Sequence, residues 1–250
     1  MAVYQLNEDL WFPDPHEGES DGLIAIGGDL SVNRLVLAYC HGIFPWFSYK
    51  DSTPLWFCPM ERYVIFPREI HISHSMRQLL RSARYEVTIN QNFDGVIRGC
   101  SMAGGRHLER GAWLGPDMIQ AYTRLHQLGF AASVEVWEPA HTATEAEGPE
   151  RRLVENPEGR LDEGSEKRLA ENPERRLVGG LYGVVLRNAF FGESMFSLVP
   201  NASKLALIHL AHTLDEIGAH FIDCQFETPH LRSMGARPIP YDEYMRILNG

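Results

Sequence analysis

The chain has 250 residues, 44% of them hydrophobic, which is enough to bury an ample core in one or two globular domains. Its formal charge of −10 argues against a general nucleic-acid binder, because phosphate contacts need clustered Lys and Arg. The first ten residues show no signal-peptide pattern, and no apolar run reaches the roughly eighteen residues of a membrane helix. The cysteines form no C-x-x-C pair, which favours reduced thiols and a cytoplasmic location.

Helix signals mark the first half of the chain. A helix is expected over 31–40, starting at Ser31 and closed by Gly42. Further helices are expected at about 75–81 and over 116–128, the latter closed by Gly129.

An octapeptide repeat interrupts the middle of the chain. The pair Arg-Leu recurs every eight residues, at 152–153, 160–161, 168–169 and 176–177. Two of the three units carry Asn-Pro, which breaks helices and strands alike. We therefore expect an insertion at about 139–176 that forms a solvated loop rather than a stacked solenoid. Residues 138–176 hold 11 acidic and 7 basic side chains, so −4 of the total charge belongs to this tract and −6 to the rest.

Strands are expected on both sides of this insertion. Residues 133–137 alternate in polarity before it. After it, residues 177–186 and 189–196 predict a hairpin that turns at Arg187 and Asn188.

A helix and a strand follow the hairpin. Asn201 or Ser203 is expected to cap the helix, and Gly218 to end it. The apolar face of this helix comprises Leu207, Leu210, Ala211, Leu214 and Ile217. The strand is expected over 220–225.

The predicted fold class is α+β, with a mostly antiparallel sheet flanked by helices. The first sixty or so residues are rich in Pro, Gly and Trp and indicate a small N-terminal domain, which we place at 1–62. A catalytic domain at 63–250 then carries the insertion.

Glu193 lies in a stretch that is otherwise built to be buried, between Ala189-Phe190-Phe191 and Met195-Phe196. An ionised carboxylate in apolar surroundings is costly unless it is paired. Alternation places Glu193, Met195 and Ser197 on one face of the strand, where a charge beside a thioether suits an amino group next to an apolar side chain. The alternative is a partly exposed Glu near a strand end, held by a neighbouring Arg or Lys.

A second carboxylate, Asp223, shares one face of an apolar strand with Gln225. If this strand joins the sheet of the hairpin, Asp223, Gln225 and Glu193 converge at one cleft. Groups placed in this way can orient a nucleophilic amine and accept its proton during acyl transfer. The alternative for Asp223 is a strand-end carboxylate that caps a neighbouring loop.

Several familiar sites are absent from the sequence. Phe196 stands where the serine-hydrolase elbow needs glycine, and no G-x-x-x-x-G-K-[ST] loop is present for ATP or GTP. Two histidine pairs, at 71/74 and 209/212, have no third ligand nearby in the sequence, so no metal is expected. No cofactor is expected either.

Ten runs of residues resemble the leucyl/phenylalanyl-tRNA–protein transferases of bacteria. They are IGGDLS at 26–31, GIFPWFS at 42–48, Trp113, AYxRLH at 121–126 with Gly129, SVEVW at 133–137, LVGGLYGV at 177–184, GESMFS at 192–197, NASK at 201–204, IDCQ at 222–225 and SMGA at 233–236. The resemblance covers nearly the whole chain outside the insertion.

The resemblance implies an enzyme that takes Leu or Phe, and less readily Met, from leucyl-tRNA or phenylalanyl-tRNA. It joins that residue to a protein with an N-terminal Arg or Lys and marks the protein for degradation. No ATP is needed, because the aminoacyl ester is already activated. The resemblance also implies an N-acetyltransferase-like catalytic domain, and we expect a monomer with no membrane partner.

Residue roles follow from the same resemblance. Asp223 and Gln225 match the pair assigned to the acceptor's α-amine, and Glu193 matches a carboxylate that holds an amino group. Trp46 and Trp113 match tryptophans near the terminal adenosine of the tRNA, although a Trp taken alone is more often core. The pocket for the transferred side chain would comprise Leu181, Phe190, Met195, Leu207, Leu210, Leu214 and Ile222. Some of the helix leucines are ordinary core in any case.

Two features depart from the family pattern. The octapeptide tract stands where members usually have a short turn, which leaves open a role over the cleft. The body is also acidic although the expected partner is a tRNA. The best candidate patch for the acceptor stem comprises Arg77, Arg81, Arg84, Arg106 and Arg110.

Two other functions are alternatives for this sequence. An acyl-CoA-dependent N-acyltransferase of the same fold needs a [RQ]-x-x-G-x-[GA] loop, and the nearest match, at 232–237, fails at its last position. A tRNA-binding protein that has lost catalysis is disfavoured by the intact Glu193, Asp223 and Gln225.

Overall fold

The computed structural model describes residues 2–47, 53–103, 114–139 and 175–250, and the statements below concern these residues. Helices and strands alternate around two mixed sheets, which confirms the α+β class. The octapeptide insertion predicted at 139–176 lies almost wholly outside the described residues. No helix in the described ranges is long and apolar enough to span a membrane.

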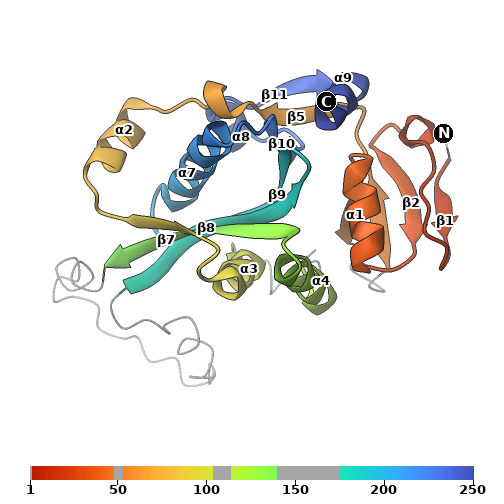
Figure 1. Cartoon of the computed structure of the whole chain (residues 1–250), viewed down its shortest axis with the longest axis horizontal. Helices are drawn as coiled ribbons and strands as arrows, with labels where there is room; N and C mark the ends of the chain where they lie inside the picture. The colour runs from red at the N-terminus through yellow and green to blue at the C-terminus, as the bar shows by residue number, and fades with distance from the viewer. Residues whose placement is uncertain (1, 48–52, 104–113, 140–174) are drawn as a thin grey trace, which may run out of the picture.

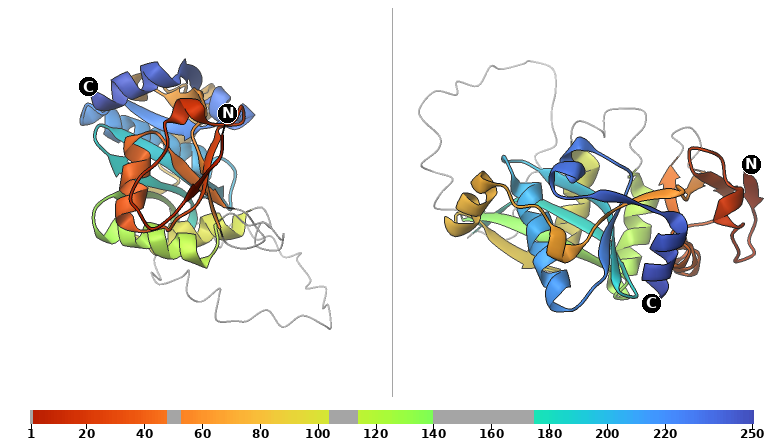
Figure 2. Two further views of the ribbon diagram at one scale, coloured as in Figure 1. Left: turned by 90° about the vertical axis from the view of Figure 1, so that its right-hand side faces the viewer. Right: turned by 90° about the horizontal axis from the view of Figure 1, so that it is seen from above.

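The N-terminal part forms a four-stranded sheet at one end of the molecule (Figures 1 and 2). Its strand order is β1 (Tyr4–Leu6), β2 (Leu23–Gly27), β4 (Pro54–Phe57) and β3 (Phe44–Phe47). A short 3₁₀ turn, η1 (Pro15–Glu17), precedes β2. Helix α1 (Val32–Cys40) packs against β3 and begins where predicted, because the Ser31 hydroxyl accepts from the Arg34 N–H.

The remaining strands form one seven-stranded sheet. Its order is β11 (Arg237–Pro240), β5 (Glu61–Ile65), β10 (Phe221–Gln225), β9 (Ala189–Ser197), β8 (Arg175–Leu186), β7 (Ala131–Pro139) and β6 (Glu86–Ile89). Only β9 and β10 run parallel, so the prediction of a mostly antiparallel sheet is confirmed. The β8–β9 hairpin turns at Arg187, whose φ of 54° is left-handed.

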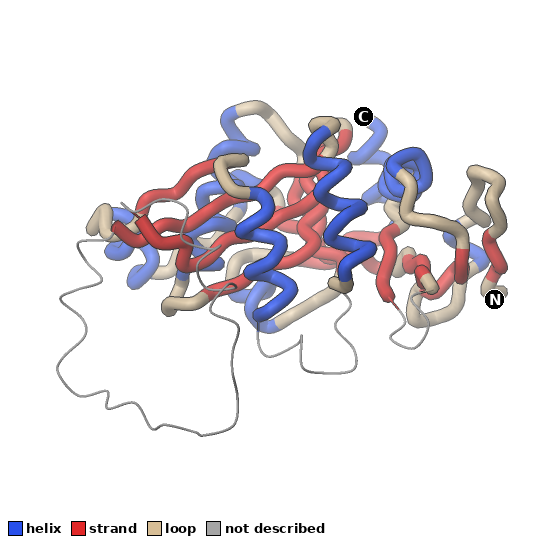
Figure 3. The backbone as a smooth tube through the Cα atoms, turned by 90° about the horizontal axis from the view of Figure 1, so that it is seen from below, coloured by secondary structure: helices blue, strands red, loops and turns tan. Residues whose placement is uncertain are grey.

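Helices cover both faces of this sheet. On one face lie α7 (Ala202–Glu216), α2 (His74–Arg81) and the 3₁₀ turn η2 (Pro67–Glu69). The other face carries α3 (Phe93–Met102) and α4 (Pro116–Gln127), which lie side by side across the strands (Figure 3). Two further helices, α8 (Pro229–Ser233) and α9 (Tyr241–Asn249), follow β10 and β11.

Sequence signals located α1, α2, α4 and α7 but missed α3, α8 and α9. The start of α7 differs in detail from the prediction. Asn201 occupies the cap position in a left-handed conformation with no capping bond, and the Ser197 hydroxyl instead accepts from the Ser203 N–H at 2.8 Å. Ile217 is 71% exposed, so placing it on the apolar face was wrong. The helix ends at Glu216, and Ile217 already belongs to the turn before Gly218.

Candidate functional site

A cavity of about 860 Å³ opens where β9 and β10 stop pairing. Their parallel register ends at Phe191 and Asp223, and the residues that follow on both strands line the cavity. Strand β8, helices α7 and α8, and strands β3 and β4 supply the remaining walls. The strand predicted to carry Asp223 therefore does share the sheet of the hairpin.

One wall of the cavity is apolar. Six residues predicted for the side-chain pocket line it: Leu181, Phe190, Met195, Leu207, Leu210 and Ile222. The seventh, Leu214, does not line the cavity but is buried in the core. It lies one helical turn beyond Leu210, past the reach of the cavity.

Glu193 enters the site at a break in strand pairing. Tyr182 pairs with Ser194 and Gly183 with Gly192, so Glu193 is the extra residue of a β-bulge. The expectation that Glu193 and Met195 share one face was wrong for this reason. Met195 packs with the core on the α7 side of the sheet, whereas Glu193 contacts tyrosines of the core on the opposite side.

The partners of Glu193 are hydroxyls and an amide. Tyr39 donates to Oε1 at 2.7 Å and Tyr122 to Oε2 at 2.8 Å, while the two hydroxyls lie 2.6 Å apart. Gln225 Nε2 donates to Oε1 at 3.0 Å. These partners replace the Arg or Lys that the alternative interpretation required.

The electrostatics of this group are unusual. Burial raises the pKa of Glu193 to about 7, although the tyrosine hydrogen bonds lower it. Burial and the nearby Glu193 charge raise the pKa of both Tyr39 and Tyr122 well above 10, so the two hydroxyls remain donors. Glu193 is thus poised to change its charge near neutral pH.

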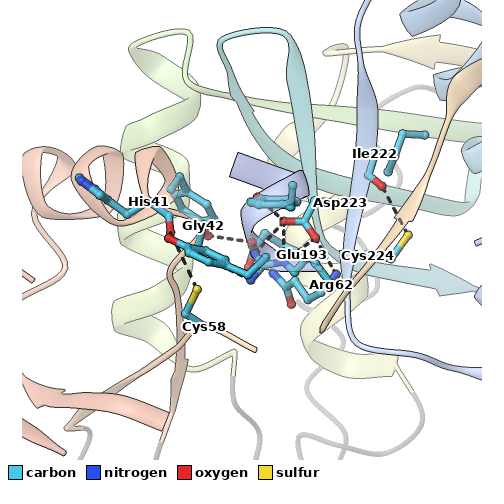
Figure 4. A network of polar contacts seen from close by, with 12 residues as sticks. His41, Gly42, Cys58, Arg62, Glu193, Ile222, Asp223 and Cys224 are labelled. Carbon is cyan, nitrogen blue, oxygen red and sulfur yellow. Dashed lines mark hydrogen bonds and ion pairs between the residues drawn. The ribbon is translucent and has the colours of Figure 1, made fainter. Parts of the chain in front are cut away.

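Asp223 lies beside this group and is fully buried. Arg62 approaches it through two nitrogens, Nε at 2.9 and 3.0 Å and Nη2 at 2.7 Å. Tyr244 donates to Oδ2 at 2.9 Å, and the Gln225 N–H donates to Oδ1 at 2.8 Å. Figure 4 shows Arg62 between Asp223 and the backbone of Gly42.

Comparison with known proteins identifies the family. The family model described as leucyl/phenylalanyl-tRNA protein transferase matches residues 64–144 and 170–249, and the model of that family's N-terminal domain matches 28–60. This chain belongs to the leucyl/phenylalanyl-tRNA–protein transferases.

Curated members agree along almost the whole chain. The leucyl/phenylalanyl-tRNA–protein transferase of Syntrophobacter fumaroxidans is 43% identical, covering 99% of this chain and 90% of its own length. Those of Anaeromyxobacter sp. and Nitrosospira multiformis are 41% and 42% identical, covering 99% and 97% of this chain and 90% and 89% of their own lengths. The chain is accordingly an enzyme, an aminoacyl-tRNA–protein transferase.

The structure describes only some of the other residues predicted for the transferase site. Trp46 lines the cavity, is 40% exposed and packs against Phe57 and Phe226. Trp113, Arg106 and Arg110 lie outside the described residues.

The remaining predicted arginines lie apart from the cavity lining. Arg77 and Arg81 are exposed on α2, and Arg84 is exposed just after it, 3.4 Å from Glu138. Nothing in the structure tests their contact with tRNA, which stays a prediction.

Sequence analysis missed four residues that contact Glu193 or Asp223 at the candidate site: Tyr39, Tyr122, Arg62 and Tyr244. The tyrosines lie on buried helix faces, where an aromatic ring is ordinary core. Arg62 carried a usable signal, because it is a charge at the start of an apolar strand, just as Glu193 is a charge within one. Among the described residues, no group of three or more His, Cys, Asp and Glu side chains is arranged to hold a metal ion.

Proposed function

We propose that this chain transfers Leu or Phe, and less readily Met, from aminoacyl-tRNA to the N-terminal Arg or Lys of acceptor proteins, and so marks them for degradation. The carrying observation is a single cavity with an apolar wall at one side and the Glu193–Gln225 pair at another. The apolar wall suits the side chain of the transferred residue. The polar pair suits the α-amino groups of the transferred residue and of the acceptor.

The reaction joins an amine to an ester carbonyl. The acceptor's α-amine attacks the carbonyl carbon, the new C–N bond forms and the bond to the ribose oxygen breaks. The amine gives up a proton, and the ribose oxygen leaves with one. Because the ester is already activated, positioning and charge stabilisation are the tasks left to the protein.

The geometry supports a division of roles at the reaction centre. Gln225 directs its Nε2 to Glu193, which leaves its carbonyl oxygen as an acceptor for the incoming amine. Glu193, when ionised, attracts an ammonium group and can accept a proton near neutral pH. Asp223 contributes to this centre through its contact with the Gln225 backbone.

The charges around the cavity support a cationic acceptor. Among the described residues that line it, four are carboxylates and none is Lys or Arg. Asp223 is already paired with Arg62 and Glu227 with Arg232, whereas Glu193 and the exposed Asp21 form no ion pair with a described residue. Such a lining favours a positively charged side chain such as that of Arg or Lys.

Finer features extend the proposal. Trp46 and Trp113 would stack on the terminal adenosine, and Arg77, Arg81, Arg84, Arg106 and Arg110 would contact the acceptor stem. The fold would be N-acetyltransferase-like, with domains at 1–62 and 63–250. The enzyme would act as a cytoplasmic monomer.

A transfer assay tests the proposal. The protein is incubated with tRNA charged with labelled Phe and with a peptide that begins with Arg, and a matched peptide that begins with Gly is the control. Label should enter the Arg peptide only. Intact tRNA binding without any transfer would instead favour a tRNA-binding protein that has lost catalysis.

A further inference from the structure

We propose that Arg62 and Tyr244 are positioning residues of the transfer reaction, which act through Asp223 to hold Gln225 against Glu193. The inference rests on the proposed function and adds one residue of helix α9 and one at the start of strand β5 to the residues that determine the rate. Neither Arg62 nor Tyr244 lines the cavity.

The Asp223 carboxylate has no free acceptor position for a substrate. Its side chain is fully buried, and its two oxygens accept from Arg62, Tyr244 and the Gln225 backbone. A carboxylate has about four acceptor sites, and these donors occupy them. Asp223 therefore acts on the reaction through the groups that it touches.

Asp223 fixes an unusual backbone conformation at Gln225. Strand pairing with β5 is irregular between Asp223 and Gln225, and Gln225 has a φ of +63°. Residues other than glycine seldom adopt this left-handed conformation, so surrounding contacts must maintain it. The bond from the Gln225 N–H to Asp223 Oδ1 is such a contact, and the conformation brings Nε2 to Glu193.

Arg62 and Tyr244 determine the orientation of the Asp223 carboxylate. The Arg62 guanidinium is fully buried and lies between the rings of Phe44 and Tyr244, at 4.8 and 5.0 Å from their centroids. Its Nη1, which does not contact Asp223, donates to the Gly42 carbonyl at 2.6 Å and so gives the guanidinium a second point of attachment. Three separate segments therefore fix one carboxylate: β5, the turn after α1, and α9.

A buried ion pair could serve stability alone, and this role must be separated from positioning. Removing either charge of the pair would leave the other buried and unpaired, which strongly destabilises a fold. Tyr244→Phe is the milder change, because it removes one hydroxyl and keeps the ring and the ion pair. Tyr241→Phe is its matched control: Tyr241 lies on the same helix, and its hydroxyl donates to the His41 carbonyl at 3.0 Å without touching Asp223.

The experiment measures kcat, the KM of both substrates and the thermal unfolding midpoint. The proteins compared are wild type, Tyr244→Phe, Tyr241→Phe, Gln225→Ala and the double variant that combines Tyr244→Phe with Gln225→Ala. We expect Tyr244→Phe to lower kcat roughly tenfold, as expected for a residue that orients a reacting group. Both KM values should stay within about twofold, since Tyr244 does not line the cavity. In the Gln225→Ala background, Tyr244→Phe should have no further effect on kcat.

Each result of this experiment either supports or overturns a positioning role for Tyr244. The inference is overturned if Tyr244→Phe keeps the wild-type kcat, if it lowers kcat equally without Gln225, or if Tyr241→Phe lowers kcat as much. A loss of thermal stability shared by both tyrosine variants, with kcat lowered only in Tyr244→Phe, supports it. Failure of the wild-type enzyme to transfer Phe would contradict the proposed function instead.

Discussion

The Tyr122 hydroxyl donates to Glu193 at 2.8 Å across 71 positions of sequence, and with Tyr39 it fixes the carboxylate from both oxygens. Two neutral donors stabilise the ionised form, yet burial still raises the pKa of Glu193 to about 7. The charge of Glu193 is therefore set by a balance that the loss of a single hydroxyl can shift.

Tyr122→Phe should raise the pKa of Glu193. Loss of one hydrogen bond to the carboxylate removes a contact that lowers the pKa of Glu193, so the transfer rate should rise with pH at a higher midpoint than in wild type. A pH profile of single-turnover transfer measures the midpoint. Tyr182→Phe is the control for this midpoint, because the Tyr182 hydroxyl is buried and has no hydrogen-bond partner in the part of the chain that the structure describes. An unmoved midpoint in Tyr122→Phe would contradict this account of Glu193.

Glu193→Gln should gain stability relative to wild type as the pH rises. The folded pKa of about 7 exceeds the ordinary 4.5, so the folded state holds a proton that the unfolded state loses between these values. Wild-type stability therefore falls across pH 4.5–7, whereas Gln does not ionise. Thermal unfolding at pH 5 and pH 8 should show a relative gain on the order of 5 °C for the variant. Parallel pH dependence of the two proteins would rule out the raised pKa.

Leu210→Ala should change donor selectivity. Leu210 lines the cavity, so its truncation enlarges the apolar wall and should alter the ratio of kcat/KM for Leu and Phe donors by about tenfold or more. Leu214→Ala is the control on the same helix: both leucines are 5% exposed, and only Leu210 lines the cavity. Each variant should lose about 2–5 kcal/mol of unfolding free energy. Equal selectivity changes in both would show that the cavity wall does not select the donor.

Asp21→Asn should weaken binding of a cationic acceptor. Asn keeps the oxygen that accepts from the Leu23 N–H at 3.0 Å and removes only the charge. The acceptor KM should rise about threefold for a peptide beginning with Arg, in keeping with an exposed charge pair. A peptide beginning with citrulline, which is neutral but similar in shape, should show no change. A rise for both peptides would indicate a structural effect of the substitution.

Arg77→Ala and Arg81→Ala should each weaken tRNA binding through lost phosphate contacts. Each should also lower the slope of log affinity against log salt concentration by about 0.7–0.9. Arg98→Ala is the control, since Arg98 is held by Asp94 at 2.8 Å on the other face of the sheet. Unchanged slopes in the α2 variants would exclude this patch from the tRNA interface.

Sequence periodicity was sufficient for much of the fold. Capping residues and glycines located α1 and α4, and alternation located the β8–β9 hairpin. Helix α3 escaped because two glycines weaken its pattern, although Gly99 allows the Phe196 ring to approach closely.

The site itself was predictable only in part. Sequence indicated Glu193, Asp223 and Gln225 because charges and amides in apolar strands are costly. It could not indicate the two irregularities in strand pairing, since alternation assumes regular strands, and these turn Glu193 toward the tyrosines and Gln225 toward Glu193. Partners from distant segments, such as Arg62 and Tyr244, required the tertiary structure.

One apolar cluster continues from the N-terminal sheet, through Tyr39 and Trp56, to Tyr122 on α4 and Phe191 of the larger sheet. Arg62 and Tyr241 add hydrogen bonds across the same junction, to the carbonyls of Gly42 and His41. The two halves are therefore not interchangeable modules. A chimera could take its N-terminal sheet from one relative and its larger sheet from another. The side chains that meet at this junction would then no longer be matched to each other, and the junction lies beside the residues proposed to align the amine. Such a hybrid could bind both substrates and still join them slowly.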